Sequence, residues 1–369
     1  MVQVLALHVG IVVAIGALLA VLLELADRFI ANYGECRIVI NESEDKSITV
    51  DGGGNLLGAL VDRKIFIPSA CGGRGSCGLC KVKVHEGGGP LLPTETPYLS
   101  KEELKNNVRL SCQVKVRNDL RIEIPPELFS IREFRGKVSR ILDRTYDMKE
   151  LTIDLLEPDS IEFKPGQYVQ LTAPEYAKSD QPVYRAYSLA SDSTHRNYVQ
   201  LLIRRVPDGI CTTWVFDYLK QGQEVSINGP YGDFFLRPTD REIIFIAGGS
   251  GLAPIRSMLF EMVHEGIDRK STFYYGAQAR ADLSYVEEMH EFEDKLPRFR
   301  FMPALSNPQQ TDEWEGPTGL ITEVVDRGDH DFKEAEAYLC GSPGMIDACI
   351  KVLSVKGMPG DQIFYDKFA

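Results

Sequence analysis

The sequence predicts an α+β multidomain chain in which one apolar segment precedes three folded parts. Three observations predict this. An uncharged apolar run lies near the N-terminus, and a glycine-rich stretch with three cysteines follows among short strand-like segments. Beyond these, strands separated by Gly and Pro turns give way to alternating strands and helices. A chain of 369 residues has room for roughly two or three domains. We place the boundaries at 1–27, 34–126, 134–238 and 239–369.

The composition is that of an ordinary folded protein and argues against a nucleic-acid partner. Apolar residues make up 44% of the chain and charged residues 25%. Asp and Glu number 53 against 41 Lys and Arg, which gives a formal net charge of -12. Binding to a phosphate backbone needs basic patches, so no nucleic-acid partner is expected.

The apolar run Val4–Leu23 has the length of a membrane span. About twenty residues at 1.5 Å rise give roughly 30 Å, the thickness of a bilayer's hydrocarbon core. A cleaved signal peptide is the alternative, but no Lys or Arg precedes the run. His8 lies within it, and we expect this side chain to face the interface or another helix rather than bind an ion. Arg28 and Arg37 follow the run. We therefore expect a single-pass anchor in the inner (cytoplasmic) membrane, with the other domains on the cytoplasmic side.

Four cysteines predict an iron–sulfur cluster. Cys71, Cys77 and Cys80 lie in the stretch "SACGGRGSCGLCKVKV", and Cys112 follows in "RLSCQV". A disulfide pair and a zinc ion are the alternatives, but structural zinc sites usually offer two short Cys pairs, and only one is present. Three cysteines on a glycine-rich loop with a remote fourth are typical of a [2Fe–2S] ferredoxin. The gap of five residues resembles the adrenodoxin-type loop, so 34–126 is expected to be a β-grasp ferredoxin domain.

The next part, 134–238, is expected to be an antiparallel β-barrel that binds a flavin, after a linker at Glu127–Phe134. In "RAYS", Arg185 suits a pyrophosphate, while Tyr187 and Ser188 suit an isoalloxazine ring and its polar edge. An ordinary barrel strand is the alternative. The stretch "GICTTWVFDYL" indicates a turn that enters a helix, whose backbone N–H groups would seat a pyrophosphate. The residues that would complete this seat are Arg204, Gly209, Thr212 and Thr213.

The last part, 239–369, alternates strands and helices as a parallel sheet does. "EIIFIAGGSGLAPIRSMLFEMV" reads as a strand, a glycine turn and a helix, which predicts a dinucleotide site without matching the G-x-G-x-x-G fingerprint. Ligands bind at the carboxyl ends of parallel strands, where Gly276, Cys340 and Gly341 are expected.

In this order, R-x-Y-S, G-x-x-T, "GGSGLAP" and "CGSPGM" resemble the ferredoxin–NADP⁺ reductase superfamily. The resemblance implies that Cys340 lies by the nicotinamide and that the chain's last aromatic residue, Phe368, covers the flavin, with Asp366 nearby. It therefore implies catalytic roles for Tyr187, Ser188, Cys340 and Phe368. For FAD it implies Arg185, Tyr187, Ser188, Gly209 and Thr212, and for NADH Gly248, Gly249, Gly251, Pro254, Cys340 and Gly341.

The whole arrangement resembles the F-subunit family of Na⁺-translocating NADH:quinone reductases. "GGGPLLPTE", "RLSCQV" and "YDKFA" are similar to stretches of that family. One departure is that only Tyr176–Tyr184 separate "LTAPE" from "RAYS", where the family has an additional segment of a few dozen residues. This departure puts docking to the usual partner subunits in doubt.

The resemblance implies a membrane-anchored NADH dehydrogenase subunit. NADH would give a hydride to FAD, and single electrons would leave through the [2Fe–2S] cluster to membrane redox subunits of a respiratory complex and ultimately to quinone. One alternative is a reductase that feeds an oxygenase, and another is a non-catalytic membrane-anchored electron carrier. Arg280 could contact the 2′-phosphate of NADPH or lie in solvent, so the preference for NADH stays open at this point.

Overall fold

The computed structural model describes residues 8, 13, 15–20 and 33–368, which form two compact units. The first unit ends at Ser130 and the second consists of Ile131–Ala369 with the short segment Pro68–Gly72. Most of the predicted anchor at 1–27 lies outside the described residues. Residues 15–20 are helical, and Ile15, Leu18 and Leu19 among them expose more than half of their surface. Among the described residues, no helix has the length and apolar character needed to cross a bilayer.

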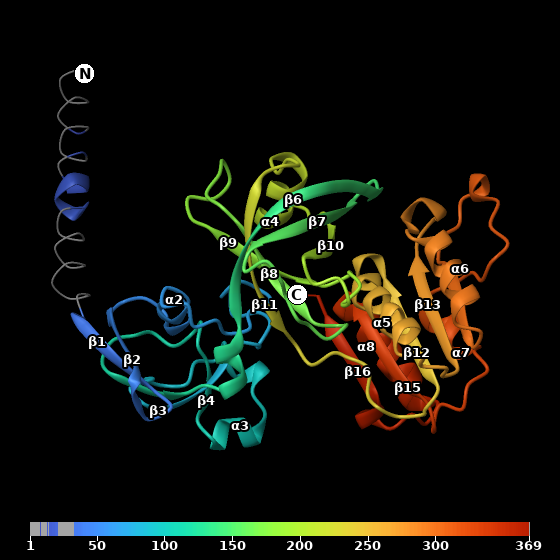
Figure 1. Cartoon of the computed structure of the whole chain (residues 1–369). Helices are drawn as coiled ribbons and strands as arrows, with labels where there is room; N and C mark the ends of the chain where they lie inside the picture. Colours follow the sequence, from blue (N-terminus) through green and yellow to red (C-terminus); the bar gives the residue numbers. More distant parts are fainter. Residues whose placement is uncertain (1–7, 9–12, 14, 21–32, 369) are drawn as a thin grey trace. The chain divides into compact units, whose positions relative to one another are not determined.

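The first unit is built on a five-stranded sheet with the order β2-β1-β5-β3-β4 (Figure 1). The alternating stretches "CRIVI" and "KSITV" form a hairpin, in which Ile38 pairs with Ile48 in antiparallel strands. Asn55 caps the short helix that follows by accepting a hydrogen bond from the Gly58 backbone N–H, 2.8 Å away. The elements are β1 (Glu35–Ile40), β2 (Ser43–Asp51), α2 (Leu56–Val61), β3 (Lys81–Glu86), α3 (Lys101–Lys105), β4 (Val108–Leu110) and β5 (Leu120–Glu123).

The second unit begins with a six-stranded antiparallel barrel in the order β10-β7-β6-β11-β8-β9. A bridge between Leu189 and Leu201 joins the outer strands and closes the barrel. The predicted end of the linker Glu127–Phe134 is wrong. The first barrel strand already begins at Arg132, which pairs with Gly229. The elements are β6 (Arg132–Thr145), β7 (Met148–Glu157), β8 (Tyr168–Ala173), β9 (Val183–Ser188), β10 (Tyr198–Arg204), α4 (Ile210–Asp217) and β11 (Glu224–Tyr231).

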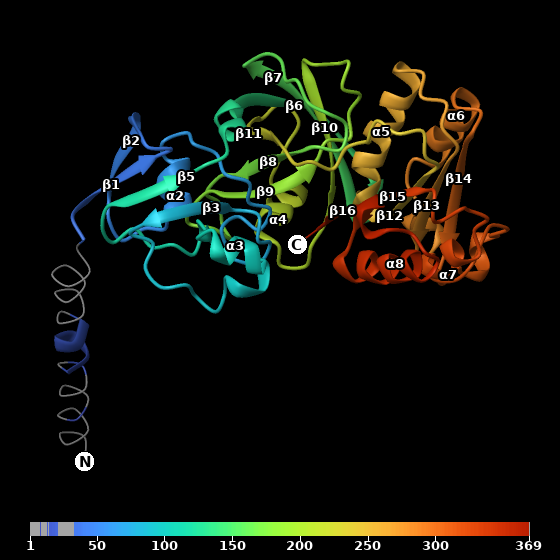
Figure 2. The same cartoon turned by 90° about the horizontal axis from the view of Figure 1, so that it is seen from below.

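A parallel five-stranded sheet, ordered β14-β13-β12-β15-β16, completes the second unit. Alternate residues of β12 pack on opposite faces, so Phe245 meets α5 and α6 while Ile246 meets α7 and α8 (Figure 2). The elements are β12 (Ile243–Gly248), α5 (Leu252–His264), β13 (Ser271–Ala277), α6 (Val286–Lys295), β14 (Phe299–Leu305), α7 (Ile321–Asp326), β15 (Glu336–Gly341), α8 (Pro343–Val355) and β16 (Ile363–Lys367).

Candidate functional site

The four predicted cluster ligands are thiols. All eight cysteines of the chain fall within the described residues, and none of them forms a disulfide. Cys71, Cys80 and Cys112 are buried, whereas Cys77 is partly exposed. A hydrogen bond with Cys112, together with burial, raises the pKa of the Cys80 thiol, so the structure brings these two sulfurs together. The Gln113 side-chain amide donates to the Cys112 sulfur over 3.5 Å.

The described residues do not gather three or more His, Cys, Asp or Glu side chains around a point that would hold a single metal ion. A two-iron cluster is larger than one ion, so its four sulfur ligands do not share one centre. The chemistry of the donors fits the cluster, because thiolates are the soft ligands that iron–sulfur centres use. The loop also needs its glycines: at Gly78, which has φ +71, a Cβ would come within 2.7 Å of the Tyr98 side chain.

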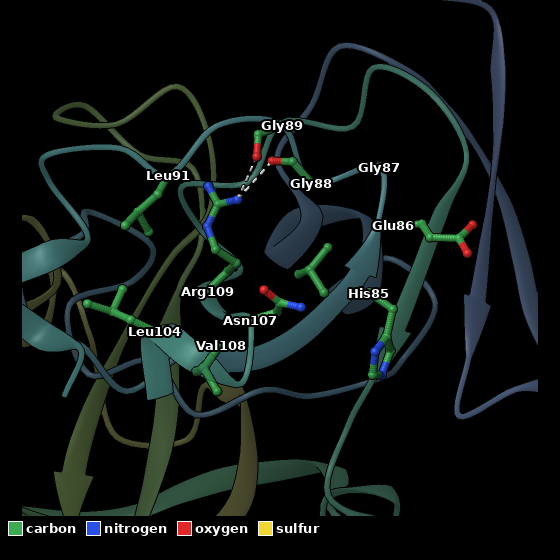
Figure 3. A pocket seen from close by; sticks show the side chains of 11 residues that line it. His85, Glu86, Gly87, Gly88, Gly89, Leu91, Leu104, Asn107, Val108 and Arg109 are labelled. Atoms are coloured by element: carbon green, nitrogen blue, oxygen red, sulfur yellow. Dashed lines mark hydrogen bonds between the residues drawn. The ribbon is translucent and has the colours of Figure 1, made fainter. Parts of the chain in front are cut away.

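A buried ion pair fixes the loop that leads from β3 towards β4. Arg109 donates to Glu95 through two nitrogens, at 2.9 and 2.6 Å, and also to the carbonyls of Gly88, Gly89 and Pro90. Burial acts to raise the pKa of Glu95, but the hydrogen bonds from Arg109 and the backbone outweigh it and lower that pKa. Figure 3 shows Arg109 directed at this loop.

The same loop borders a cavity of about 340 Å³ (Figure 3). Its lining includes His85, Leu91, Leu104 and Asn107, and none of the predicted site residues takes part. The Arg109 guanidinium is already bound to Glu95 and to loop carbonyls, so it is not available to an anion in the cavity.

The predicted flavin residues lie on β9. The Tyr187 hydroxyl is fully buried beside Cys211 and has no hydrogen-bond partner of ordinary geometry, and burial raises its pKa. An unsatisfied buried hydroxyl costs about 1–3 kcal/mol, so a polar ligand that reached it would be stabilised. Arg185 donates to the carbonyl of Tyr184 at 2.7 Å, and Ser188 is buried. This part of the strand therefore fits a flavin.

The predicted pyrophosphate seat lies at the start of α4. Gly209 precedes the helix, and the Thr212 hydroxyl accepts a hydrogen bond from the Val206 N–H at 3.2 Å. Thr212 and Thr213 are both buried. A Cβ on Gly209 would come within 2.5 Å of the Thr212 hydroxyl, so this turn leaves no room for a larger residue. The Thr212 hydroxyl thus supports the turn itself.

Arg204 is predicted to bind the same pyrophosphate. It lies beside the nucleotide turn, the segment Gly248–Gly251 between β12 and α5. Its Nε donates to Asp147 at 2.7 Å, and one terminal nitrogen lies 3.0 Å from where a Cβ on Gly249 would stand. The carbonyl of Gly249 accepts a hydrogen bond from the Tyr275 hydroxyl at 3.1 Å. A cation from the barrel thus lies at the carboxyl end of β12.

The nucleotide turn is packed tightly against the end of β15. A Cβ on Gly251 would lie 2.2 Å from the Cys340 carbonyl oxygen, a distance that no side chain can occupy. Gly248 and Gly276 are paired across β12 and β13. Pro254 is buried in the first turn of α5. The structure therefore brings the predicted NADH residues to one edge of the parallel sheet.

The four residues predicted to be catalytic come from distant parts of the chain. Two of them, Ser188 and Cys340, lie next to Asp366 on β16, and Phe368 directly follows that strand. Ser188 donates to Asp366 over 3.5 Å, and Cys340 pairs with Asp366 across β15 and β16. The Phe368 N–H donates to the Gly341 carbonyl at 3.0 Å. Tyr187 instead packs against the barrel core.

Burial sets the protonation of this group. It raises the pKa of Asp366 to about 6 and, with the Asp366 charge, raises that of the Cys340 thiol well above its usual value. Cys340 is therefore a neutral thiol. Sequence reasoning named Asp366 only as a neighbour of Phe368, because its contact with Ser188 joins residues 178 positions apart.

Arg280 is held by a neighbouring loop. Its backbone N–H donates to the Asp312 carboxylate at 3.2 Å, and its guanidinium donates to the Asp312 carbonyl at 2.9 Å. Asp312 also accepts from the backbone of Gln309 at 2.8 Å. The guanidinium is thus bound within the protein by the loop around Asp312.

Comparison with protein families matches three domains in the expected order. Residues 39–117 match the 2Fe-2S iron-sulfur cluster binding domain, 135–236 the oxidoreductase FAD-binding domain and 245–351 the oxidoreductase NAD-binding domain. The predicted cofactors, a [2Fe–2S] cluster, FAD and NAD, are thereby confirmed.

Two solved structures cover most of the chain. A cytochrome P450 reductase from Amycolatopsis, GcoB, aligns with TM-score 0.72 and 27% identity over 90% of this chain and 98% of its own. The ferredoxin reductase in carbazole 1,9a-dioxygenase aligns with TM-score 0.70 and 29% identity over 91% of this chain and 98% of its own.

Relatives that match nearly the whole chain share one description, the F subunit of a Na(+)-translocating NADH-quinone reductase. That of Idiomarina loihiensis is 37% identical over 402 aligned positions, which cover 98% of each chain. That of Neisseria meningitidis serogroup B is 37% identical, over 95% of this chain and 96% of its own. Since 402 aligned positions exceed the 369 residues here, the first relative carries at least 33 residues that this chain lacks. The chain belongs to the F-subunit family of Na(+)-translocating NADH-quinone reductases.

Proposed function

We propose that this chain oxidises NADH and delivers the electrons one at a time to a membrane redox partner, ultimately quinone, in a Na⁺-translocating NADH:quinone reductase-like complex. FAD supplies the exchange between a two-electron hydride and single electrons, and the [2Fe–2S] cluster carries the single electrons onward. The observation that carries the proposal is the meeting of Ser188 with Asp366, which itself pairs with Cys340. A flavin strand and a nucleotide-binding sheet thus converge on one partly buried carboxylate.

The barrel residues hold the flavin in this proposal. Arg185 and the N-terminus of α4, with Gly209, Thr212 and Thr213, bind the pyrophosphate. Tyr187 offers its unsatisfied buried hydroxyl to the cofactor, and Ser188 binds the polar edge of the ring. The partnership of Ser188 with Asp366 orients that hydroxyl.

The parallel sheet holds NADH at the carboxyl ends of β12, β13 and β15. Gly248, Gly249, Gly251, Pro254, Gly276 and Gly341 let the dinucleotide approach the backbone closely. Cys340 would lie by the nicotinamide, and the Phe368 ring would cover the flavin face on which the nicotinamide must stack. The position of Arg204 beside Gly249 supports a contact with the NADH phosphates in place of the flavin pyrophosphate. The engagement of Arg280 with Asp312 supports NADH over NADPH.

The cluster ligands in this proposal are Cys71, Cys77, Cys80 and Cys112. A helix at 1–27 anchors the chain in the inner (cytoplasmic) membrane, with the catalytic domains on the cytoplasmic side. The exposed apolar side chains of Ile15, Leu18 and Leu19 support a bilayer contact for this segment.

A second candidate function is supported by the solved structures. The P450 reductase and the dioxygenase reductase both align over nearly their full lengths, and the chain lacks at least 33 residues of its Idiomarina relative. We place that gap in the loop between β8 and β9, which folds as a short turn with Tyr176 bridged to Ser179. In this second candidate function the chain feeds electrons to an oxygenase.

Purification from native membranes separates the two functions. We expect the chain to copurify with integral membrane redox subunits, and NADH to bleach flavin and cluster absorption and reduce quinone in that complex. Copurification with a hydroxylase would overturn the membrane proposal, and a chain whose flavin NADH does not bleach would overturn any dehydrogenase function.

Replacement of Phe368 with Ala tests the nicotinamide site. We expect the variant to show an altered charge-transfer band on mixing with NADH and altered kinetics of flavin reduction, because the ring no longer competes for the flavin face. The exposed ring of Tyr365, replaced with Ala, serves as the control. An unchanged spectrum and unchanged kinetics would remove Phe368 from the site.

A further inference from the structure

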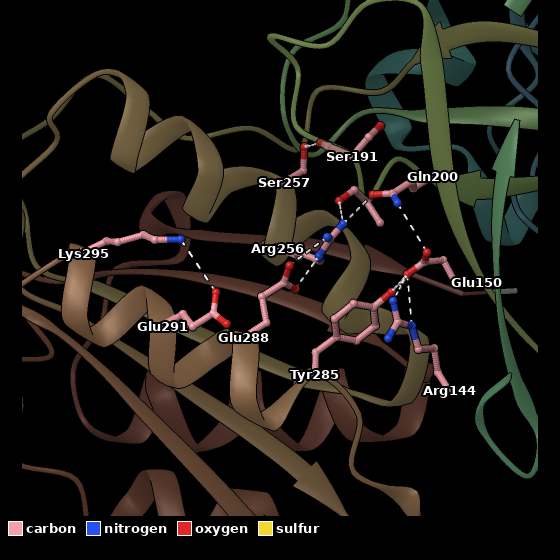
Figure 4. A network of polar contacts seen from close by, with 11 residues as sticks. Arg144, Glu150, Ser191, Gln200, Arg256, Ser257, Tyr285, Glu288, Glu291 and Lys295 are labelled. Carbon is pink, nitrogen blue, oxygen red and sulfur yellow. Dashed lines mark hydrogen bonds and ion pairs between the residues drawn. The ribbon is translucent and has the colours of Figure 1, made fainter. Parts of the chain in front are cut away.

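Arg256 joins the two lobes of the second unit, the flavin barrel and the nucleotide-binding sheet. It lies on α5 and is almost completely buried. Two of its nitrogens donate to the Glu288 carboxylate of its own lobe, at 2.6 and 2.9 Å. The third donates to the barrel, to the Ala190 carbonyl at 2.6 Å and the Gln200 side chain at 2.9 Å (Figure 4).

Two further contacts from the same helix meet the next two barrel residues. The Ser257 hydroxyl donates to the Ser191 carbonyl at 2.7 Å, and His264 lies 2.7 Å from the Asp192 carboxylate. The helix therefore contacts Ala190, Ser191 and Asp192 in succession through hydrogen bonds. Three adjacent positions of the barrel are thus fixed against one helix.

A second carboxylate, which unlike Glu288 is buried, extends the link. Glu150, on β7, accepts hydrogen bonds from Arg144 and from the Gln200 amide at 3.3 Å. Tyr285, at the start of α6 in the other lobe, donates to the same carboxylate. Gln200 touches both Arg256 and Glu150, so the two sets of contacts form one network across the lobes.

Both ends of this network lie close in sequence to the reacting groups. The nucleotide turn ends at Gly251, five positions before Arg256 on the same rigid helix. Ser188, the flavin residue, lies two positions before Ala190. A shift of α5 relative to the 190–192 segment would therefore change the separation of nicotinamide and flavin directly.

From this geometry we infer that Arg256 is a positioning residue for hydride transfer, which fixes the nucleotide turn relative to the flavin strand. The inference rests on the proposed function and deepens it. Only an arginine meets the requirement, because its planar fork satisfies a carboxylate bidentately while a further nitrogen reaches the other lobe. The single ammonium group of a lysine would bind either Glu288 or the barrel carbonyl of Ala190, and not both as the arginine does.

The test uses the purified, FAD- and cluster-loaded full chain with Arg256→Met. Stopped-flow measurement gives the limiting rate constant of flavin reduction and the Kd for NADH. We expect the rate constant to fall by about 10- to 100-fold, since a displacement on the order of 1 Å has that effect on an aligned reaction. We expect the Kd to change by less than about threefold, because the nucleotide turn itself is intact. The rate constant of Arg256→Lys should lie between those of Arg256→Met and the unaltered chain.

Hydrogen exchange supplies a readout that does not depend on activity. In Arg256→Met, residues 189–193 and α5 should exchange faster, while the β1–β5 sheet of the first unit should keep its protection. Glu291→Gln is the matched control on the same lobe, because its pair with Lys295 is exposed and spans 3.8 Å (Figure 4). The control should leave the rate constant and the exchange pattern unchanged.

A double variant separates positioning from stability. Arg256→Met with Glu288→Met removes the buried guanidinium together with its partly exposed carboxylate partner, which should restore most of the thermal stability that the single variant loses. We expect flavin reduction to stay slow in the double variant. Recovery of the rate together with stability would overturn the inference, as would an unchanged rate in Arg256→Met.

A milder variant covers the case in which Arg256→Met does not fold. Ser257→Ala deletes one hydrogen bond between the lobes and leaves no buried charge. We expect the rate constant of flavin reduction to fall by about a few-fold, which corresponds to the net free energy of one hydrogen bond. The Kd for NADH should stay unchanged. If the unaltered chain itself is not reduced by NADH, the proposed function fails; if it is reduced and the variants match it, only this inference fails.

Discussion

The two units each bury an arginine, and they use it differently. Arg109 in the first unit donates to Glu95, 14 positions away, and to carbonyls of the same loop that lie 19 to 21 positions away. Arg256 in the second unit divides its donors between Glu288 in its own lobe and Ala190 in the barrel, 66 positions away. One arginine therefore closes a loop, and the other joins two lobes. Similar burial does not imply a similar role.

The largest expected effect comes from breaking the first arrangement with Glu95→Ala. This change leaves the Arg109 charge buried without a counter-ion, which costs about 3–5 kcal/mol of the free energy of unfolding. Because β4 leads from Arg109 to Cys112, cluster absorption should be lost as well. Urea unfolding and the visible spectrum measure both effects. Glu123→Gln, at the exposed pair with Lys83, should leave the free energy of unfolding nearly unchanged; equal losses in the two variants would contradict the role of burial.

Glu150→Gln tests the second arrangement. The amide cannot accept from Arg144 and Tyr285 as the carboxylate does, so we expect a loss of about 1.5–3 kcal/mol in the stability of the second unit. Cluster absorption should persist, in contrast to Glu95→Ala, because three of the four cluster cysteines, Cys77, Cys80 and Cys112, belong to the first unit. Calorimetry with simultaneous visible detection provides the measurement, and loss of the cluster in Glu150→Gln would show that the two units do not respond separately.

Asp366→Asn tests whether a titrating carboxyl lies where the barrel meets the parallel sheet, between Ser188 and Cys340. Burial raises the pKa of Asp366 to about 6, so the folded chain binds this proton more tightly than the unfolded chain does. The resulting stabilisation is complete below about pH 4 and is lost as the pH rises through 6. The variant should match the unaltered chain at pH 4 or below and melt at a higher temperature at pH 8. The exposed Asp361→Asn is the control, and a gain that is independent of pH would contradict the assignment.

The smallest effect is expected from Glu261→Gln on α5. Burial, with the nearby Glu265 charge, raises the pKa of Glu261 to about 7, and one of its oxygens is buried without a partner. Stability from the protonated form is therefore lost as the pH rises from about 4 to 7. The variant should gain less than about 1 kcal/mol at pH 8 and nothing at pH 4 or below. Glu265→Gln should give a smaller gain of the same sign, and a loss in either variant would count against this explanation.

Local patterns predicted the elements well. The alternation in "CRIVI" and "KSITV" predicts the hairpin that the structure shows, and the glycine turn after "EIIFIA" predicts the strand, turn and helix around Gly248. The sequence does not reveal where the linker ends, because no turn residue in "IREF" marks the start of the strand at Arg132. Periodicity reports local geometry, and here it was sufficient for these elements.

The contacts that complete the site are not local, so the sequence could not predict them. Ser188 and Asp366 lie 178 positions apart, and Tyr285 and Glu150 lie 135 apart. No spacing rule relates such pairs; they exist only because the barrel and the parallel sheet pack together. Arg256 carries no local signal either, since a single arginine on a predicted amphipathic helix is expected to face solvent.

The fit of Gly251 against Cys340 bears on attempts to change the coenzyme preference. A library that varies the nucleotide turn would yield mostly inactive clones, because any side chain at 251 meets the Cys340 carbonyl oxygen at 2.2 Å. Diversity is better directed to the exposed turn after β13, where Arg280 and Asp312 hold each other without contacting this junction. The site thus divides into a part that tolerates redesign and a part that does not.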